Sequence, residues 1–126
     1  MKPTLLIVDD NEMMRTFLSF YLGDFFEAHE FNSAEDARDW LGDGNKPDLI
    51  LADLHMPGLS GLEFLHLLKS RPAWNPIPVI MVSGEENTDE KIKCLEAGAA
   101  DYIVKPFNPK ELELRINKLL NLKISQ

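Results

Sequence analysis

The chain has 126 residues, of which 44% are hydrophobic and 27% charged, and its formal net charge at pH 7 is −8. This length predicts one domain with a substantial core, and no apolar run approaches the roughly 20 residues needed to cross a bilayer. The acidity and the lack of a basic cluster in the sequence argue against direct binding of DNA or RNA. Its single cysteine, Cys94, cannot form an internal disulfide, and the N-terminal segment has no signal-peptide pattern. We therefore expect a cytoplasmic protein without a membrane or nucleic-acid partner.

Short apolar runs alternate with helix-like segments five times along the chain. The predicted strands cover residues about 4–9, 26–31, 48–53, 77–83 and 101–104. The predicted helices cover residues about 11–22, 33–43, 60–70, 87–97 and 108–121. Short apolar runs between helices are typical of parallel strands buried on both faces. The pattern therefore predicts an α/β domain, with an open parallel sheet and helices on both sides.

The first predicted helix has two apolar faces. One stripe, at the i, i+3, i+4, i+7 spacing of a core-facing helix, consists of Met14, Phe17, Leu18 and Tyr21. Met13 and Phe20 lie about 90–110° away from this stripe at the helical step of 100°. We expect these two side chains either to border the core or to form an exposed face on which a partner helix could dock.

Polar residues stand at the C-terminal ends of four of the five apolar runs. They are Asp9 and Asp10 after the first run, Asp53 after the third, Ser83 after the fourth and Lys105 after the fifth. The carboxyl ends of parallel strands share one edge of the sheet, and ligands bind in the crevice there. The sequence thus predicts three carboxylates, a hydroxyl and an ammonium group in one crevice. This combination is suited to Mg²⁺ and a phosphoryl group.

In this order and at these strand ends, the polar residues resemble those of the response-regulator receiver domain of two-component signalling. The motifs that carry the resemblance are Asp9-Asp10, the segment from Asp53 to Gly58, Ser83-Gly84 and the segment from Tyr102 to Phe107. The resemblance covers residues 4 to about 121, so residues 1–126 are interpreted as one receiver domain. It implies a flavodoxin-like, doubly wound (βα)5 fold with strand order 2-1-3-4-5.

The resemblance also implies a role for each carboxylate. Asp53 would be the phosphoacceptor, because a carboxylate can attack phosphorus to give an acyl phosphate. Asp10, Asp53 and the backbone carbonyl of His55 would bind Mg²⁺ directly, and Asp9 would bind it largely through water. Three neighbouring carboxylates repel one another, and a bound Mg²⁺ ion would relieve that repulsion.

Four further residues receive roles from the resemblance. Lys105 would pair with Asp53 before phosphorylation and with the phosphoryl oxygens afterwards. The bond before Pro106 would be cis, which would turn Lys105 into the crevice. Ser83 would donate a hydrogen bond to the phosphoryl group, and Tyr102 would then move from an outward to an inward position.

Two positions are predicted to set the lifetime of the phosphorylated form. His55 and Glu85 lie two residues after Asp53 and Ser83, where receivers control the access of water to the phosphoryl group. Histidine is a less usual residue at the first of these positions. Gly84 departs from the alanine that commonly follows the hydroxyl residue.

The resemblance implies a Mg²⁺-dependent phosphoacceptor switch rather than a turnover enzyme, although it would assist its own phosphorylation and slow dephosphorylation. A sensor histidine kinase or a histidine phosphotransfer protein would be the donor. The signal would leave through the fourth helix, the fifth strand and the fifth helix, toward an output domain, an effector or a second copy. The chain could equally be a stand-alone receiver or one excised from a larger regulator.

Two other classes of protein remain possible from the residues. A phosphohydrolase of the haloacid-dehalogenase type also uses an Asp nucleophile, Mg²⁺ and Lys, but it has a second Asp where this chain has His55. A flavodoxin-like FMN-binding protein would need a phosphate-binding loop after the first strand. Asp9 and Asp10 occupy that place and would repel a phosphate.

Overall fold

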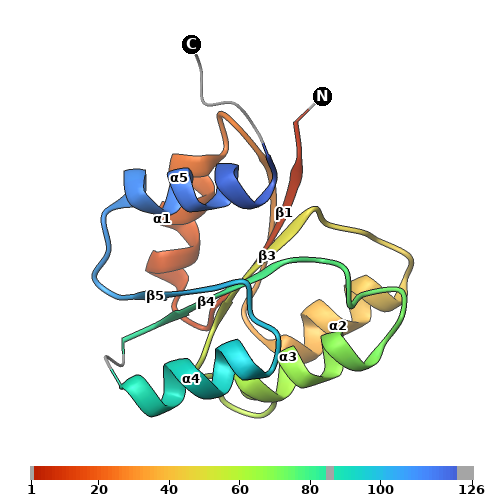
Figure 1. The fold of residues 1–126 in the computed structure, drawn as a ribbon. Helices are drawn as coiled ribbons and strands as arrows, with labels where there is room; N and C mark the ends of the chain where they lie inside the picture. Colours follow the sequence, from red (N-terminus) through yellow and green to blue (C-terminus); the bar gives the residue numbers. More distant parts are fainter. Residues whose placement is uncertain (1, 85–86, 122–126) are drawn as a thin grey trace.

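Five strands alternate with five helices within residues 2–84 and 87–121, the ranges that this computed structural model describes (Figure 1). The strands are β1 (Thr4–Val8), β2 (Glu27–Phe31), β3 (Leu49–Asp53), β4 (Val79–Ser83) and β5 (Asp101–Val104). The helices are α1 (Glu12–Leu22), α2 (Ala34–Gly42), α3 (Gly61–Ser70), α4 (Thr88–Glu96) and α5 (Pro109–Leu119). Each predicted element is confirmed, with its ends shifted by at most about two residues, the usual uncertainty of sequence patterns.

The five strands form one parallel sheet in the order β2-β1-β3-β4-β5, as predicted. Helices α1 and α5 cover one face of the sheet, and α2, α3 and α4 cover the other (Figure 1). Strand order reverses beside β1, because the chain passes from β1 to β2 on one side and returns to β3 on the other. Ligands of such sheets bind at the carboxyl ends of the strands next to this reversal, here β1 and β3.

Both faces of the sheet are closed by apolar packing. In β1, Leu6 and Val8 belong to the core under α2, α3 and α4, whereas Leu5 and Ile7 belong to the core under α1 and α5. Every residue of β3 and β4 is buried. Successive side chains of a strand point to opposite faces, so a strand covered on both sides must be apolar at each position. This explains the continuous apolar runs. The packing also fixes the positions of the strand ends.

The predicted helix boundaries rest on side-chain caps that the structure contains. Ser60 and Glu63 form a complete capping box at the start of α3. Ser33 caps α2 and Asn108 caps α5, each by accepting a backbone N–H of the first helical turn. Gly98 follows α4 with a φ of 106°, a conformation that favours glycine, and ends that helix.

Fewer side chains of α1 are buried against the sheet than the sequence predicts. Leu18 and Leu22 are fully buried against the sheet, but Phe17 is 42% exposed, so its assignment to the core was wrong. Phe17 lies one helical step of about 100° from Leu18, which turns it away from the contact line. Met13 and Phe20 are 83% and 85% exposed, so they do not border the core. Helix α1 therefore presents an apolar face to solvent.

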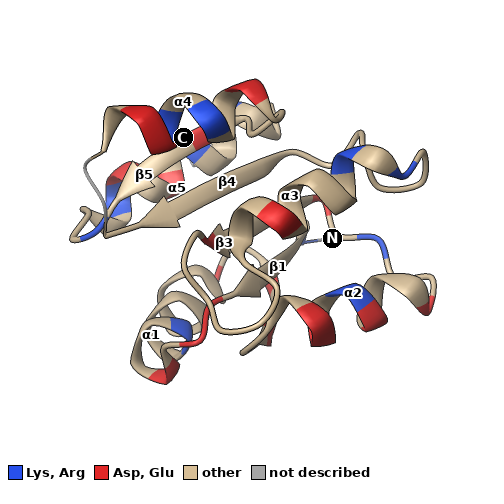
Figure 2. Ribbon diagram, turned by 90° about the horizontal axis from the view of Figure 1, so that it is seen from below, with Lys and Arg blue, Asp and Glu red and all other residues tan. Residues whose placement is uncertain are grey.

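Within the described residues, the lysines and arginines do not gather in one region of the fold. In Figure 2 the lysines and arginines are distributed over several helices and loops, and acidic residues lie among them. Of the helices in the described part of the chain, none has both the length and the apolar character that a membrane crossing requires.

Gly61, at the start of α3, packs directly against the end of β3, and we predict that it cannot be replaced by alanine. An added Cβ would overlap the Asp53 carbonyl oxygen and would lie 2.7 Å from Leu54 Cα, where both neighbours are backbone. We expect Gly61→Ala to lower the free energy of unfolding by about 3 kcal/mol, as overpacked sites do. Urea denaturation measures this change. At Gly42 an added Cβ meets nothing within 4 Å, so Gly42→Ala is the control and should not destabilise. Equal stabilities of the two variants would contradict the packing at Gly61.

Candidate functional site

Three carboxylates meet at the carboxyl ends of β1 and β3. Asp9 directly follows β1, Asp10 comes next, and Asp53 is the last residue of β3. Val8 lies opposite Ala52 in the parallel register, which sets the two strand ends side by side. One carboxylate oxygen from each residue lies within 4.8 Å of the others. Asp9 and Asp53 are buried and Asp10 is exposed, so the cluster opens to solvent on the Asp10 side.

Lys105 brings one ammonium group to this cluster. Its Nζ lies 3.0 Å from Asp9 Oδ2 and 3.7 Å from Asp53 Oδ2. The predicted pair with Asp53 is therefore present, but Asp9 is the closer partner. The Asn11 N–H binds the other oxygen of Asp9 at 2.9 Å, which orients that carboxylate. Among the described residues, the Lys105 ammonium is the charge paired with these carboxylates. Three carboxylates against one paired ammonium leave the crevice with an excess of negative charge.

The pKa of Asp53 is raised from its ordinary value of 3.8 to about 6. Burial is the largest cause, and the charge of Asp9 adds to it. The ammonium of Lys105 and a hydrogen bond from the His55 backbone N–H act in the opposite direction. Asp53 is thus ionised at neutral pH, but its ionised form lowers the stability of the folded protein.

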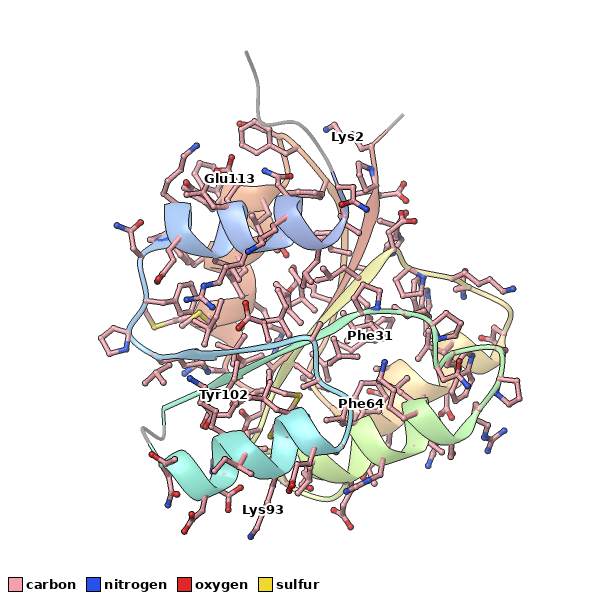
Figure 3. All side chains as sticks on the ribbon, viewed as in Figure 1. Lys2, Phe31, Phe64, Lys93, Tyr102 and Glu113 are labelled. Atoms are coloured by element: carbon pink, nitrogen blue, oxygen red, sulfur yellow. The ribbon has the colours of Figure 1, made fainter. Side chains whose placement is uncertain are left out.

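The predicted switch residues lie along β4 and β5, next to the carboxylates. Ser83 ends β4 and is fully buried, and its carbonyl accepts the Lys105 N–H at 2.7 Å. The Lys105–Pro106 peptide bond is cis, as predicted. Tyr102 is 5% exposed and lies in the core on the side of α4 (Figure 3). The structure shows this inward position, and the movement of Tyr102 stays a prediction.

The structure describes only one of the two residues that are expected to control the access of water. His55 is exposed, and its backbone N–H contacts the Asp53 carboxylate. Glu85 lies outside the described residues. The metal contact of the His55 carbonyl and the effect of both side chains on lifetime stay predictions.

Arg15 is a residue of this site that the sequence analysis missed. Its Nη1 donates to the Asp9 carbonyl oxygen at 2.7 Å, and its Nε lies 3.4 Å from Glu30 Oε1 on β2. The side chain is only 14% exposed. It fixes the backbone that carries Asp9 and adds a positive charge beside the acidic cluster. An arginine one turn into a helix that follows an acidic strand end is the signal that could have revealed it.

The donor set of the cluster fits Mg²⁺. All three side chains offer carboxylate oxygens, the ligand type that Mg²⁺ prefers. The uncompensated negative charge favours a divalent cation as well. Asp10, the exposed member, leaves one side open for the waters that Mg²⁺ usually retains.

Comparison with known proteins gives the family. A model of the response regulator receiver domain matches residues 5–117. The chain is 41% identical over 118 residues to the phosphate regulon transcriptional regulatory protein PhoB of Pseudomonas aeruginosa, covering 93% of this chain and 51% of PhoB. It is 36% identical over 122 residues to the cyclic di-GMP phosphodiesterase response regulator RpfG of Xanthomonas campestris pv. campestris, covering 94% of this chain and 32% of RpfG. The chemotaxis protein CheY4 of Vibrio cholerae matches the fold with a TM-score of 0.87 at 26% identity, covering 94% of this chain and 99% of that structure.

The chain therefore belongs to the response regulator receiver domain family, and the resemblance seen in the sequence is confirmed. It is a signalling domain with the flavodoxin-like receiver fold. The family assignment favours neither the phosphohydrolase nor the FMN-binding class. The chain spans about half of PhoB and about a third of RpfG.

We predict that Asp53→Asn stabilises the metal-free protein at neutral pH. The raised pKa of about 6 means that ionised Asp53 costs the fold up to about 3 kcal/mol above pH 6, at 1.4 kcal/mol per pKa unit. At about pH 3, below the ordinary pKa of 3.8, the carboxyl is largely protonated in both the folded and the unfolded chain, so the cost nearly disappears. The variant should gain about 1–3 kcal/mol at pH 7.5 and almost nothing at pH 3. Urea denaturation in EDTA measures both values.

The control for this prediction is Asp24→Asn, which removes an exposed carboxylate between α1 and β2. It should change stability little at either pH. A gain for Asp53→Asn that does not vary with pH would contradict the raised pKa.

Proposed function

We propose that this domain is a Mg²⁺-dependent phosphoacceptor switch of two-component signalling, in the cytoplasm. A phosphohistidine of a sensor histidine kinase or a histidine phosphotransfer protein would be the donor, and Asp53 the acceptor. One observation carries the proposal. Asp53 is an almost buried carboxylate at the end of β3, clustered with Asp9 and Asp10 and 3.7 Å from the ammonium of Lys105.

The chemistry requires an ionised acceptor and a counter-charge. With a pKa of about 6, Asp53 is a carboxylate at neutral pH, and one of its oxygens would attack phosphorus. The new P–O bond forms as the P–N bond to the donor breaks, and the imidazole of the donor keeps the electron pair of that bond. Lys105 would pair with the phosphoryl oxygens, and Ser83 would donate a hydrogen bond to one of them.

Asp9, Asp10 and Asp53 would hold the Mg²⁺ ion, with the His55 backbone carbonyl as a further ligand and Asp9 acting largely through water. When bound, the ion would offset the repulsion among the carboxylates and stabilise negative charge on the phosphoryl group. His55 and Glu85 would set how easily water reaches the acyl phosphate, and so how long the signal lasts.

The exposed apolar face of α1 would receive the phosphodonor. Met13, Phe17 and Phe20 line a groove of about 480 Å³ together with two polar residues. Isolated apolar residues are common on surfaces, but three on one helix face are suited to an apolar partner helix. Helix α1 begins at Glu12, two residues after Asp10. A helix docked there would carry its phosphohistidine to the mouth of the crevice.

The face formed by α4, β5 and α5 would carry the output. A groove of about 450 Å³ there is lined by residues that include Lys91, Tyr102 and Arg115. Both oxygens of Asp101 accept from Arg115 Nη1 at 2.8 Å, which ties β5 to α5. Phosphorylation would bias two arrangements of this face through Ser83 and Tyr102. The partner that binds this face would be an output domain, an effector or a second copy of the chain.

We predict that acetyl phosphate with Mg²⁺ adds one phosphoryl group to the protein. Intact mass spectrometry should show the adduct, and hydroxylamine should remove it because acyl phosphates react with that nucleophile. Asp53→Asn should remain unlabelled, since an amide cannot form the acyl phosphate. The matched control, Asp24→Asn, should label like the unaltered protein. Equal labelling of Asp53→Asn would show that the acceptor is another residue.

A further inference from the structure

The loop from Leu54 to Ser60 links the proposed phosphoacceptor to α3. Its first residues are anchored: the Leu54 N–H donates to the Val82 carbonyl at 3.1 Å, and both Leu54 and Met56 are buried in the core. Between them, the backbone N–H of His55 donates to the carboxylate of Asp53. The position of this loop therefore decides how His55 faces the site.

The second half of the loop is more exposed and is held from another element. Pro57 and Gly58 are exposed, and Gly58 has a φ of 75°, which favours glycine. Glu35, the second residue of α2, reaches this segment, and its Oε2 accepts the Leu59 N–H at 2.9 Å. A Cβ added at Gly58 would collide with Oε2 of Glu35, which shows that the carboxylate lies directly against the Gly58 backbone.

The contact is made by the ionised form of Glu35. The hydrogen bond from Leu59 is the largest cause that holds the pKa of Glu35 below its usual value. Hydrogen bonds to a charged acceptor are shorter and stronger than those between neutral groups. A carboxylate from α2 thus fastens the exposed half of a loop whose first half contacts the phosphoacceptor.

We propose that Glu35 is a positioning residue for phosphoryl transfer. By holding the segment from Gly58 to Leu59, it fixes the loop so that the backbone of His55 keeps its orientation toward Asp53 and the metal site. Glu35 acts through the loop and touches neither the acceptor nor the phosphoryl group. The role rests on the proposed function of Asp53. Gly58 suits this contact, because a Cβ there would displace the Glu35 carboxylate from its present position.

The test compares Glu35→Ala with Asp36→Ala. Both remove an acidic side chain from the first turn of α2, so the loss of charge at the helix N-terminus is matched. The readouts are the initial rate of labelling by acetyl phosphate, the Mg²⁺ concentration giving half that rate, and the midpoint of urea unfolding. Glu35→Gln retains an acceptor oxygen at the same position and serves as the rescue variant.

For Glu35→Ala we expect labelling about three- to tenfold slower and a comparable rise in the Mg²⁺ requirement, at or below the lower end for groups that orient metal ligands. Glu35→Gln should recover most of both, and Asp36→Ala should stay within about twofold of the unaltered protein, as a surface change does. The unfolding midpoints of the two alanine variants should be similar.

Two results would overturn the role of Glu35. Identical rates and Mg²⁺ requirements for Glu35→Ala and Asp36→Ala would show that the loop keeps its position without the carboxylate. A lower unfolding midpoint of Glu35→Ala with an unchanged rate would show that its contact serves stability alone. If the unaltered protein is labelled, either result refutes the positioning role and leaves the proposed function intact. An unaltered protein that cannot be labelled would refute both.

Discussion

Electrostatic repulsion among Asp9, Asp10 and Asp53 is the constraint on which the chemistry of this domain depends. The parallel sheet brings the three carboxylates to within 4.8 Å of one another, and among the described residues the ammonium of Lys105 pairs with Asp9 and Asp53. The pKa of Asp53, raised to about 6, expresses both its burial and this repulsion. The fold tolerates the cost because packing on both faces of the sheet holds the strand ends in place. Such strained sites are typical of functional centres, where stability is exchanged for reactivity.

Positively charged side chains from different elements surround the carboxylates and partly offset their negative charge. Arg15 of α1 fixes the carbonyl of Asp9 from one side, and Lys105 compensates Asp9 and Asp53 from the end of β5. Lys105 is also joined through its backbone N–H to Ser83 on β4. A change of charge at Asp53 therefore acts directly on the ends of β4 and β5. Tyr102 lies on β5, three residues before Lys105, so the proposed output face adjoins the residue that pairs with the proposed acceptor.

Much of this arrangement could be predicted from the sequence because it depends on local patterns. Apolar runs and capping residues give the elements, and parallel strands bring their terminal Asp9, Asp53 and Ser83 to one edge. The strand order came from the family resemblance, since apolar patterns do not specify which strands are neighbours. Side-chain contacts between distant residues could not be predicted from the sequence in the same way. The orientation of Phe17 depends on how α1 sits on the sheet, and the bond from Glu35 joins residues 24 positions apart. Such contacts depend on tertiary packing, which no local signal encodes.

The excess negative charge of the crevice can be tested most directly by measuring the free energy of unfolding in urea at increasing Mg²⁺ concentration. A cation that binds only the folded chain stabilises it by RT ln(1 + [Mg²⁺]/Kd). The unaltered protein should become steadily more stable, beyond what NaCl of equal ionic strength produces. Asp10→Ala should lose most of this dependence, because one of the three carboxylates is gone. An equal gain in both proteins, or a gain no larger than that caused by NaCl, would contradict a metal site at these three carboxylates.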